Sequence, residues 1–240
     1  MPKVFLSAGH SKSDPGAVAG GTTEHAEVQK IVDAAAGKFQ KTGAEIVVAP
    51  ENLSLREKIL WINARADKSD FAIEIHLNAA GNPAANGVEV WFCAGKTTEK
   101  SVAEYLAGAL SSRLLMKNNG AKPDTENRHG RLGFVRDTIC HAFLFECGFL
   151  TNPTDLQKFR TRGKNALFET LVDLFLGGNP LLNPEKAWPF RDTFPADFFF
   201  SAVKKAKKKG ILTKKPLFYP NKNITRGEVL TILNRLSLFD

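Results

Sequence analysis

Cysteine is scarce in this chain, and long apolar runs are absent. Only Cys93, Cys140 and Cys147 occur among 240 residues, and no Cys-x-x-Cys pair is present. An odd number of widely spaced cysteines argues against a disulfide framework and against a thiolate zinc site. Apolar runs fall far short of the roughly 18 residues of a membrane helix, and the run Val4–Leu6 after a single lysine is too short for a signal peptide. We therefore expect a leaderless protein without a membrane segment.

Positive charge is concentrated in the last quarter of the chain. Residues 181–240 hold twelve basic and five acidic residues, which is +7 of the net charge of +8. This asymmetry predicts a small basic module attached to a near-neutral one, with an anionic partner such as nucleic acid, a membrane surface or an acidic wall polymer. The cluster Lys204–Lys209 lacks interleaved aromatic residues and any nucleic-acid reader motif, so we expect no nucleic-acid partner. A solvated helix face explains the cluster equally well.

Strand-like and helix-like segments alternate over the first 180 residues. Apolar runs typical of buried strands occur at 3–8, 45–48, 71–77, 87–92 and 142–147, and amphipathic stretches typical of helices at 24–41, 54–67, 97–118 and 155–176. This alternation predicts an α/β fold in which helices flank a twisted, mainly parallel sheet. Three prolines between Asn179 and Pro189 indicate a linker. We divide the chain into a first domain, 1–178, a linker, 179–189, and a small, mostly helical C-terminal domain, 190–240.

Polar side chains stand at the ends of several predicted strands. His10 follows the first strand, His76 ends a β-rich run, and Glu146 ends the apolar run that begins at Phe143. Glu24 opens the first helix. Ligands of open parallel sheets bind beyond the carboxyl ends of the strands, and a charge at the end of a buried run is costly unless it is paired or ligated. Two imidazoles, a carboxylate and a water form a common catalytic zinc shell, and a second carboxylate can act as general base. The pattern predicts a zinc hydrolase, although packing, helix capping or ion pairing explains each residue taken singly.

Three ordered motifs make this prediction more specific. They are Val4-Phe5-Leu6-Ser7-Ala8-Gly9-His10 followed by Asp14-Pro15-Gly16-Ala17, then Ile73-Glu74-Ile75-His76-Leu77-Asn78-Ala79, and Phe145-Glu146-Cys147-Gly148-Phe149-Leu150-Thr151-Asn152-Pro153. Together with the strand Gly87-Val88-Glu89-Val90, they resemble the zinc-dependent N-acetylmuramoyl-L-alanine amidases of the third type, over residues 2–178. The resemblance implies one zinc ion per chain, held by His10, Glu24 and His76, with Glu146 as the catalytic carboxylate.

Some neighbouring residues offer alternatives to this assignment. Glu27 lies one helical turn after Glu24, but Glu24 has Ile31 and Val32 seven and eight residues further on, as the family pattern has, so we prefer Glu24. The helical phase predicts that His25 is an exposed bystander. Cys147 is expected to be an inert, buried thiol, because no histidine neighbour is evident to lower its pKa. We assign His129 and His141 to surface or packing roles.

The resemblance also implies a substrate, which is peptidoglycan. The reaction would be zinc-assisted hydrolysis of the amide between N-acetylmuramic acid and L-alanine of the stem peptide. The tail adds Phe190-Arg191-Asp192, Gly210-Ile211, Phe218-Tyr219-Pro220 and Ile224-Thr225-Arg226-Gly227-Glu228, which resemble one surface-layer-homology motif. Such motifs bind anionic secondary polymers of Gram-positive walls and often occur in threes. If a single motif binds too weakly alone, self-association into a homo-oligomer would raise the avidity.

Several biological roles suit a wall hydrolase with a binding tail. The missing leader favours a phage endolysin, which stays in the host cytoplasm until the membrane is permeabilised and then acts on the wall. A mother-cell or autolytic bacterial amidase is the alternative, as is a non-catalytic wall-binding protein with a residual zinc site. The intact Glu146 argues against the last. A carboxypeptidase would need an arginine-lined carboxylate pocket, and the sequence identifies none.

Overall fold

A six-stranded mixed sheet forms the centre of the described part of the chain, which comprises residues 2–39, 45–127 and 130–176 of a computed structural model. The strands are β1 Val4–Ala8, β4 Ile46–Val48, β5 Phe71–Asn78, β6 Val88–Phe92, β7 Asn118–Pro123 and β8 His141–Phe149, and a separate hairpin comprises β2 Val18–Ala19 and β3 Thr22–Thr23. The sheet order is β4-β1-β5-β8-β6-β7. Strands β4, β1, β5 and β8 are parallel to one another, whereas β6 and β7 run antiparallel to them. This confirms the predicted mainly parallel α/β sheet and adds one antiparallel junction, between β8 and β6.

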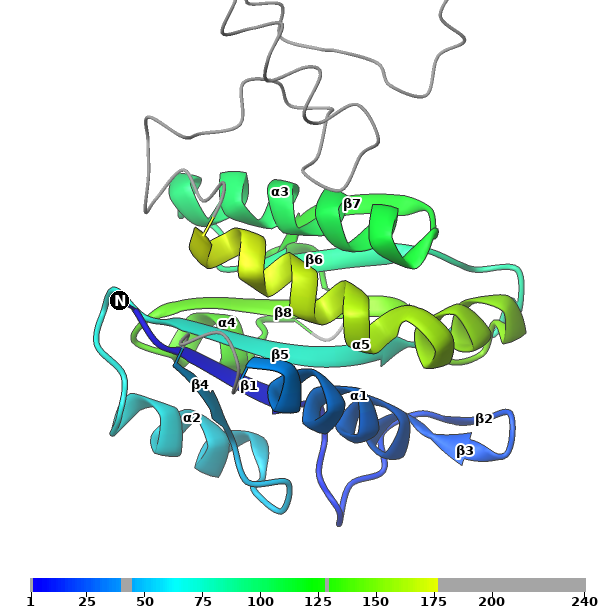
Figure 1. Cartoon of the computed structure of the whole chain (residues 1–240), viewed down its shortest axis with the longest axis horizontal. Coiled ribbons are helices and arrows are strands. Elements are labelled where there is room, and N and C mark those ends of the chain that lie inside the picture. Colours follow the sequence, from blue (N-terminus) through cyan, green and yellow to red (C-terminus); the bar gives the residue numbers. More distant parts are fainter. Residues whose placement is uncertain (1, 40–44, 128–129, 177–240) are drawn as a thin grey trace, which may run out of the picture. The chain divides into compact units, whose positions relative to one another are not determined.

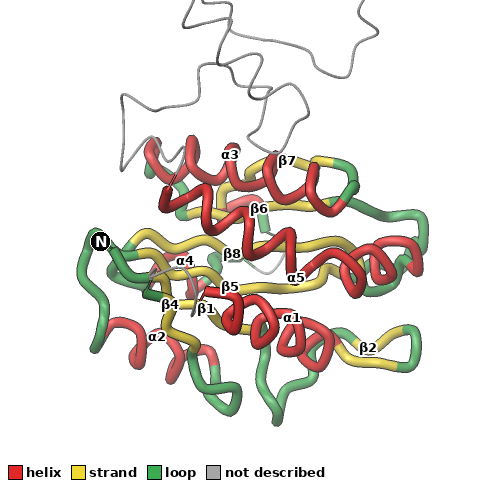
Figure 2. Tube along the Cα trace, viewed as in Figure 1, coloured by secondary structure: helices red, strands yellow, loops and turns green. Residues whose placement is uncertain are grey.

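Helices cover both faces of the sheet (Figures 1 and 2). They are α1 Glu24–Phe39, α2 Leu55–Asn63, α3 Thr97–Leu114, α4 Gly133–Asp137 and α5 Pro153–Leu176, with one 3₁₀ turn at Asp124–Glu126. Helices α1, α5 and α3 pack side by side on one face, and α2 and α4 lie on the other. None of the described helices combines the length and the apolar composition that a membrane span needs.

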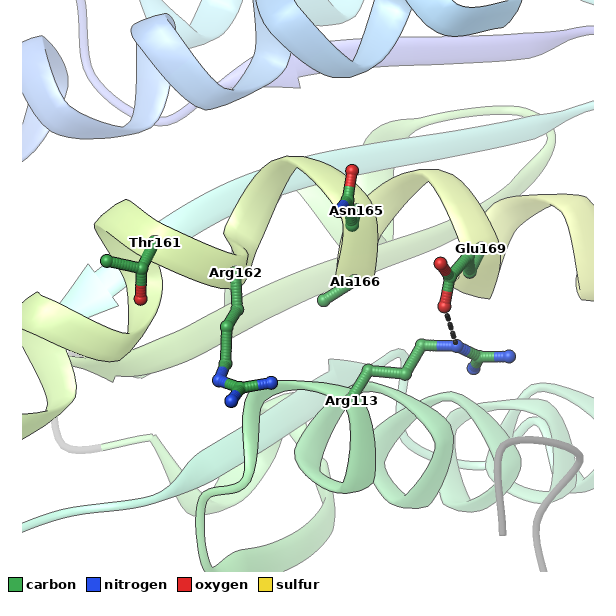
Figure 3. A pocket seen from close by; sticks show the side chains of 6 residues that line it. All are labelled: Arg113, Thr161, Arg162, Asn165, Ala166 and Glu169. Atoms are coloured by element: carbon green, nitrogen blue, oxygen red, sulfur yellow. Dashed lines mark hydrogen bonds and ion pairs between the residues drawn. The ribbon is translucent and has the colours of Figure 1, made fainter. Parts of the chain in front are cut away.

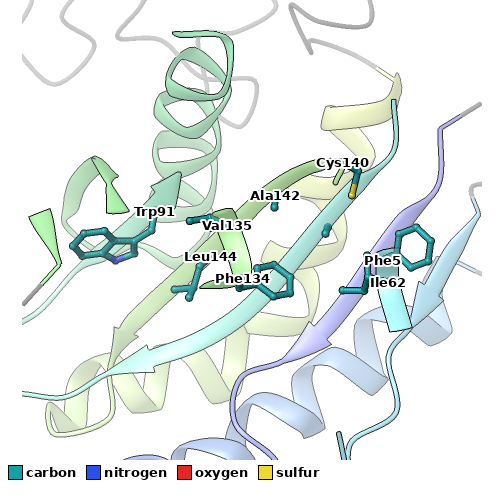
Figure 4. Packing of buried hydrophobic residues seen from close by; sticks show 9 residues of the cluster. Phe5, Ile62, Trp91, Phe134, Val135, Cys140, Ala142 and Leu144 are labelled. Atoms are coloured by element: carbon teal, nitrogen blue, oxygen red, sulfur yellow. The ribbon is translucent and has the colours of Figure 1, made fainter. Parts of the chain in front are cut away.

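A hydrophobic core lies between the sheet and the α2–α4 layer (Figure 4). Its members are Phe5, Ile62, Ala72, Trp91, Phe134, Val135, Cys140, Ala142 and Leu144. Successive side chains of a strand point to opposite faces. Ala72 therefore shares its face with Glu74 and His76 further along β5, and Leu144 shares it with Glu146. Each of these strands is apolar where it crosses the core and polar where it ends.

Some predicted boundaries differ from the structure. The helix expected over 97–118 ends at Leu114, because Leu115 adopts a left-handed backbone (φ 56°) and caps it, and Asn118 begins β7. Helix α4 was not predicted, since five residues are too few to show a helical period. The predicted linker and C-terminal helical domain lie outside the described residues, and the domain boundaries stay predictions.

An ion pair joins the first turn of α1 to α5. Arg160 of α5 donates two hydrogen bonds to the buried carboxylate of Glu27 in α1, with Nε–Oε2 at 2.9 Å and Nη2–Oε1 at 2.7 Å. The hydroxyl of Thr22 donates a third, at 2.7 Å. The hydrogen-bonded Arg160 lowers the pKa of Glu27 to about 2, against an ordinary value of 4.5. Glu27 is therefore ionised in the folded protein and belongs to the packing between α1 and α5.

Replacing Arg160 by alanine should reduce stability in a pH-dependent way. Because the pKa of Glu27 is lowered on folding, its contribution is complete above pH 4.5 and is lost as the pH falls towards 2. We expect Arg160→Ala to lower the free energy of unfolding at pH 7 modestly, because the Arg160 side chain is 48% exposed. Urea unfolding of both proteins between pH 7 and pH 2 measures this, with the exposed neighbour Arg162→Ala as control. A stability difference that stays constant down to pH 2 would contradict the assignment.

Candidate metal centre and active site

Two histidines and a glutamate meet where β1 and β5 end. His10 follows β1, His76 lies near the end of β5, and Glu24 is the first residue of α1, which begins at the same edge (Figure 1). Because β1 and β5 are parallel neighbours, their carboxyl ends lie side by side. The two imidazole centroids are 5.2 Å apart, and one donor atom from each of the three residues lies within 4.8 Å of the others. Among the described residues, this is the one group of at least three histidine, cysteine or acidic side chains close enough to hold a metal ion.

The carboxylate of Glu24 faces both imidazoles. Its Oε2 lies 3.1 Å from Nε2 of His10, and its Oε1 lies 2.8 Å from Nδ1 of His76. Burial alone would raise the pKa of Glu24, but hydrogen bonds from the two imidazoles outweigh it and hold the pKa well below its usual range. Glu24 is thus kept ionised, which is the form that binds a cation.

The other nitrogen of each imidazole also faces a carboxylate. Nδ1 of His10 is hydrogen-bonded to Oδ2 of Asp14 at 2.9 Å. Nε2 of His76 lies 3.2 Å from Oε2 of Glu74, which is an ion-pair distance without hydrogen-bond geometry in the described part of the chain. Metal-binding histidines usually give their second ring N–H to a carboxylate or carbonyl, which fixes the tautomer. Two such histidines and one buried carboxylate are a donor set that suits zinc.

Two glycines allow the donors to approach one another. A Cβ on Gly16 would collide with the imidazole of His10 and with Oε2 of Glu24, and Gly16 also has a left-handed backbone, at φ 67°. A Cβ on Gly9 would collide with the ring of His76. These glycines, which the opening motif contains, are therefore needed for the donors to converge.

Glu146 lies on the strand next to His76. The two residues are partners in the β5–β8 register, which places their backbones roughly 5 Å apart with side chains on the same face. Oε2 of Glu146 is buried and has no hydrogen-bond partner in the described part of the chain. Burial raises the pKa of Glu146 to about 8, and the carboxylates of Glu24 and Glu89 add to the shift. A carboxylate with a raised pKa beside a metal donor is suited to accept a proton from water.

A cavity of about 340 Å³ opens beside these donors. Its polar side is lined by the two imidazoles, Glu74, Lys58 and the hydroxyl-rich loop 11–14. Its apolar side is lined by Leu55 of α2, Leu132, and the core residues Phe134 and Leu144, two of the side chains drawn in Figure 4. The two imidazoles thus face a space that can receive part of a substrate.

A second cavity, of about 380 Å³, lies between α3 and α5 (Figure 3). Its lining residues are Arg113, Thr161, Arg162, Asn165, Ala166 and Glu169. Arg113 is already paired with Glu169 and Asp173. None of the residues that we predicted for the site lines this cavity.

Glu27 and His25, the neighbours of Glu24 that we considered as alternatives, do not take part in the group of donors. Glu27 turns away from the imidazoles towards Arg160. The prediction that His25 is exposed is wrong: its ring is buried and its Nδ1 lies 2.9 Å from the carbonyl oxygen of Gly9. The periodicity of α1 places His25 on the side of the helix that does not face the sheet. It is buried nevertheless, because the first turn of α1 packs against the loop after β1. His129 lies outside the described residues.

His141 and Cys147 lie in the packed surroundings that we expected for them. His141 contacts Glu99 and the ring of Phe71. Cys147 is buried, and burial raises the pKa of its thiol well above the usual value, as expected of an inert residue. Sequence reasoning missed Glu74, which faces the imidazole of His76, and Lys58, which pairs with Glu74. A charged residue inside the apolar run 71–77 was the one available signal for Glu74.

Comparison with protein families decides the broader class of the protein. The profile of the family described as N-acetylmuramoyl-L-alanine amidase matches residues 4–172. The chain belongs to this family. A second profile, that of the S-layer homology domain, matches residues 189–230, which lie outside the described part. The donors His10, Glu24 and His76 and the acidic residue Glu146 therefore lie within an amidase-family domain, and their individual roles stay predictions.

Curated relatives of this amidase-family chain include proteins of the cell wall. The probable cell wall amidase LytH of Staphylococcus epidermidis is 30% identical over 156 residues, which cover 63% of this chain and 49% of the relative. The N-acetylmuramoyl-L-alanine amidase LytC of Bacillus subtilis is 25% identical over 162 residues, which cover 65% of this chain and 31% of the relative. The chain spans about half the length of the first curated relatives that it matches.

Solved structures share the fold of the domain. An N-acetylmuramoyl-L-alanine amidase from Clostridium difficile 630 superposes with a TM-score of 0.63 at 22% identity, covering 72% of this chain and 96% of that one. A putative amidase from Neisseria meningitidis has a TM-score of 0.59 at 29% identity, covering 71% and 94%. The catalytic domain of an endolysin targeting Clostridia difficile has a TM-score of 0.58 at 24% identity, covering 72% and 96%.

Substitution of the two neighbouring glutamates should separate a metal ligand from a structural residue. We expect Glu24→Ala to lose bound zinc, because it removes the carboxylate that faces both imidazoles. Glu27→Ala should keep zinc and lose stability instead, because it breaks the pair with Arg160. Metal analysis after dialysis, together with thermal unfolding, measures both effects, and His76→Ala serves as a second metal-deficient variant. Full zinc content in Glu24→Ala would remove Glu24 from the site.

Proposed function

We propose that this chain is a zinc-dependent amidase that cleaves the bond between N-acetylmuramic acid and L-alanine in peptidoglycan. The observation that carries the proposal is the convergence of His10, Glu24 and His76 beside Glu146, at the edge of a cavity. Membership of the amidase family supplies the substrate class. The names of the curated relatives, cell wall amidases among them, support the same substrate.

The residues fit the metal on geometric grounds. Nε2 of His10, Nδ1 of His76 and the carboxylate of Glu24 would hold zinc. Their arrangement depends on Gly9 and Gly16, because a Cβ at either position would collide with a donor side chain. When bound, zinc supplies a Lewis acid that polarises a carbonyl and lowers the pKa of water. Asp14 orients the imidazole of His10 through a hydrogen bond to its outer nitrogen, and the charge of Glu74 lies 3.2 Å from the outer nitrogen of His76. With three protein ligands, the site leaves room for water and substrate.

Glu146 performs the proton transfers in this proposal. Its carboxylate accepts a proton from the attacking water as the new C–O bond forms at the lactyl carbonyl. It then donates that proton to the nitrogen of L-alanine as the amide C–N bond breaks. The products are the free lactyl carboxylate of the sugar and a stem peptide with a new amino terminus. The buried, unpartnered Oε2 supports this role, because its raised pKa favours holding a proton between the two transfers.

We propose that the C-terminal segment holds the enzyme on its substrate. The S-layer homology match at 189–230 and the net charge of +7 in residues 181–240 support binding to an anionic secondary polymer of Gram-positive walls. A catalytic module joined to a wall-binding module suits a phage endolysin that acts once the host membrane is permeabilised, and we propose this role. An autolytic bacterial amidase is the alternative, because the relatives include cell wall amidases as well as an endolysin domain.

The proposed reaction predicts one product and one essential carboxylate. Digestion of purified Gram-positive walls should release new N-terminal L-alanine without new reducing sugar ends. Glu146→Gln should keep its fold and most of its zinc but digest walls about 10²–10⁴-fold more slowly, because it removes a general base. End-group labelling and turbidity loss measure the two effects. Reducing ends in place of L-alanine would indicate a glycosidase, and lysis at the wild-type rate in Glu146→Gln would exclude this residue as the base.

The proposed tail function predicts binding that is partly electrostatic. The full chain carrying Glu146→Gln, which is expected to digest its target far more slowly, should sediment with intact walls and should bind less well to walls stripped of secondary polymers. Binding should weaken as salt rises from 0.1 M to 1 M, where the Debye length falls from about 10 Å to about 3 Å. Arg226→Ala should bind more weakly, because Arg226 is the best candidate for contact with an anionic group of the polymer. Equal binding to stripped walls would leave only a non-specific effect of charge.

A further inference from the structure

A buried lysine lies beneath the proposed metal centre. The Lys58 side chain on α2 is only 3% exposed, which is rare for a lysine that lacks partners. Its Nζ donates to the carbonyl oxygen of Ala8 at 2.6 Å and to Oε1 of Glu74 at 2.6 Å. A longer contact, of 3.4 Å, reaches the carbonyl oxygen of His10. The three acceptors match the three N–H groups of an ammonium, and they belong to the two segments that carry the imidazoles.

The first segment is the bend after β1. His10 has a left-handed backbone, at φ 61°, a conformation that costs free energy for a residue with a Cβ and needs support from its surroundings. The carbonyls of Ala8 and His10 flank this bend, and Lys58 contacts both of them. The ammonium therefore holds the backbone that directs the imidazole of His10 towards Glu24.

The second segment is the end of β5. Glu74 is 4% exposed and uses its two oxygens differently: Oε1 accepts from Lys58, and Oε2 lies 3.2 Å from Nε2 of His76. A buried carboxylate is costly without a cation, so Lys58 allows Glu74 to stay charged at this position. Glu74 in turn lies at ion-pair distance from Nε2 of His76, on the side of the ring away from Glu24, and Nδ1 is directed at Glu24.

We propose that Lys58 is a positioning residue that orients both imidazoles, His10 through the bend after β1 and His76 through Glu74. The inference rests on the proposed function, because it assigns to the lysine the task of preparing the zinc donors. An ion pair with a purely structural role does not require contacts with both segments that carry the imidazoles, whereas Lys58 makes them. Buried ion pairs are often replaceable by apolar residues without loss of stability, so we expect the consequence of losing this pair in metal binding.

The test measures zinc affinity rather than turnover. Zinc is titrated against a chelator of known affinity in the full chain, in Lys58→Met, in Glu74→Gln and in the double variant. The double variant leaves no unpaired buried charge, which favours folding. Loss of an outer partner of a metal ligand typically costs 10–100-fold in affinity, and we expect a loss of this size in Lys58→Met and in the double variant.

A matched control separates positioning from general stability. Arg136 and Asp124 form another ion pair with a buried carboxylate, which accepts from the backbone of Ala94 and contacts none of the three donors in the described residues. The double variant Arg136→Met with Asp124→Asn should bind zinc as the wild type does, because neither residue contacts a donor. Zinc affinity within twofold of wild type in the Lys58 and Glu74 double variant, or an equal loss in the control, overturns the proposal.

The ring nitrogens of His76 give a measurement that needs no variant. In the zinc-loaded wild type, ¹⁵N spectra should show Nδ1 of His76 bound to metal and Nε2 protonated, with a slowly exchanging proton, because Nε2 faces Glu74. Metal bound at Nε2 instead overturns the inference. A wild-type chain that binds no zinc overturns the proposed function and this inference with it, whereas normal zinc binding in all variants overturns this inference alone.

Discussion

The site at the ends of β1 and β5 depends on the contacts that the carboxylate of Glu24 makes with the imidazoles of His10 and His76. Glu24 lies between two imidazoles from neighbouring parallel strands, with one oxygen for each, and it is the first residue of the helix that packs against those strands. This single side chain therefore connects the loop after β1, the end of β5 and the start of α1. The cost of burying its charge is offset by two hydrogen bonds from the imidazoles, in a position where a cation can take over that task.

The polar groups of the edge are continuous with an apolar core. Along β5, Ala72 packs in the core between the sheet and the α2–α4 layer, and two residues later the same face carries Glu74 and then His76. Along β8, Leu144 is followed in the same way by Glu146. The core holds the strands in register, and the register sets the spacing of the donors. The buried pair of Lys58 and Glu74 lies at this boundary, where the core ends and the chemistry begins.

Family membership and the local geometry contribute different information. Relatives with the same fold include proteins described as cell wall amidases and a domain from an endolysin, so the fold is shared by proteins of different biological settings. The proposed chemistry follows from the site itself: two imidazoles with carboxylates beside their outer nitrogens, a glutamate between them, and Glu146, whose buried Oε2 has no hydrogen-bond partner among the described residues. The basic tail adds charge and an S-layer homology match to this domain, and the role proposed for both is binding to the wall rather than catalysis.

The sequence by itself determined the fold class, the family and the residues proposed for the site. It could do so because strand and helix periods are local, and because His10, His76 and Glu146 stand in short motifs at strand ends. Helix α4 and the exact end of α3 were out of reach, since a short helix has no readable period and a left-handed cap at Leu115 has no sequence signal such as glycine.

Only the tertiary structure decided which glutamate faces the imidazoles. Glu24 and Glu27 differ by one turn of the same helix, and the choice depends on Arg160, more than 130 positions away, which engages Glu27. The burial of His25 and the contacts of Lys58 were decided in the same way, because each is made with a segment distant in the chain. Periodicity reports the side of a helix on which a residue lies, whereas its partner depends on how separate elements pack, and that information is not local.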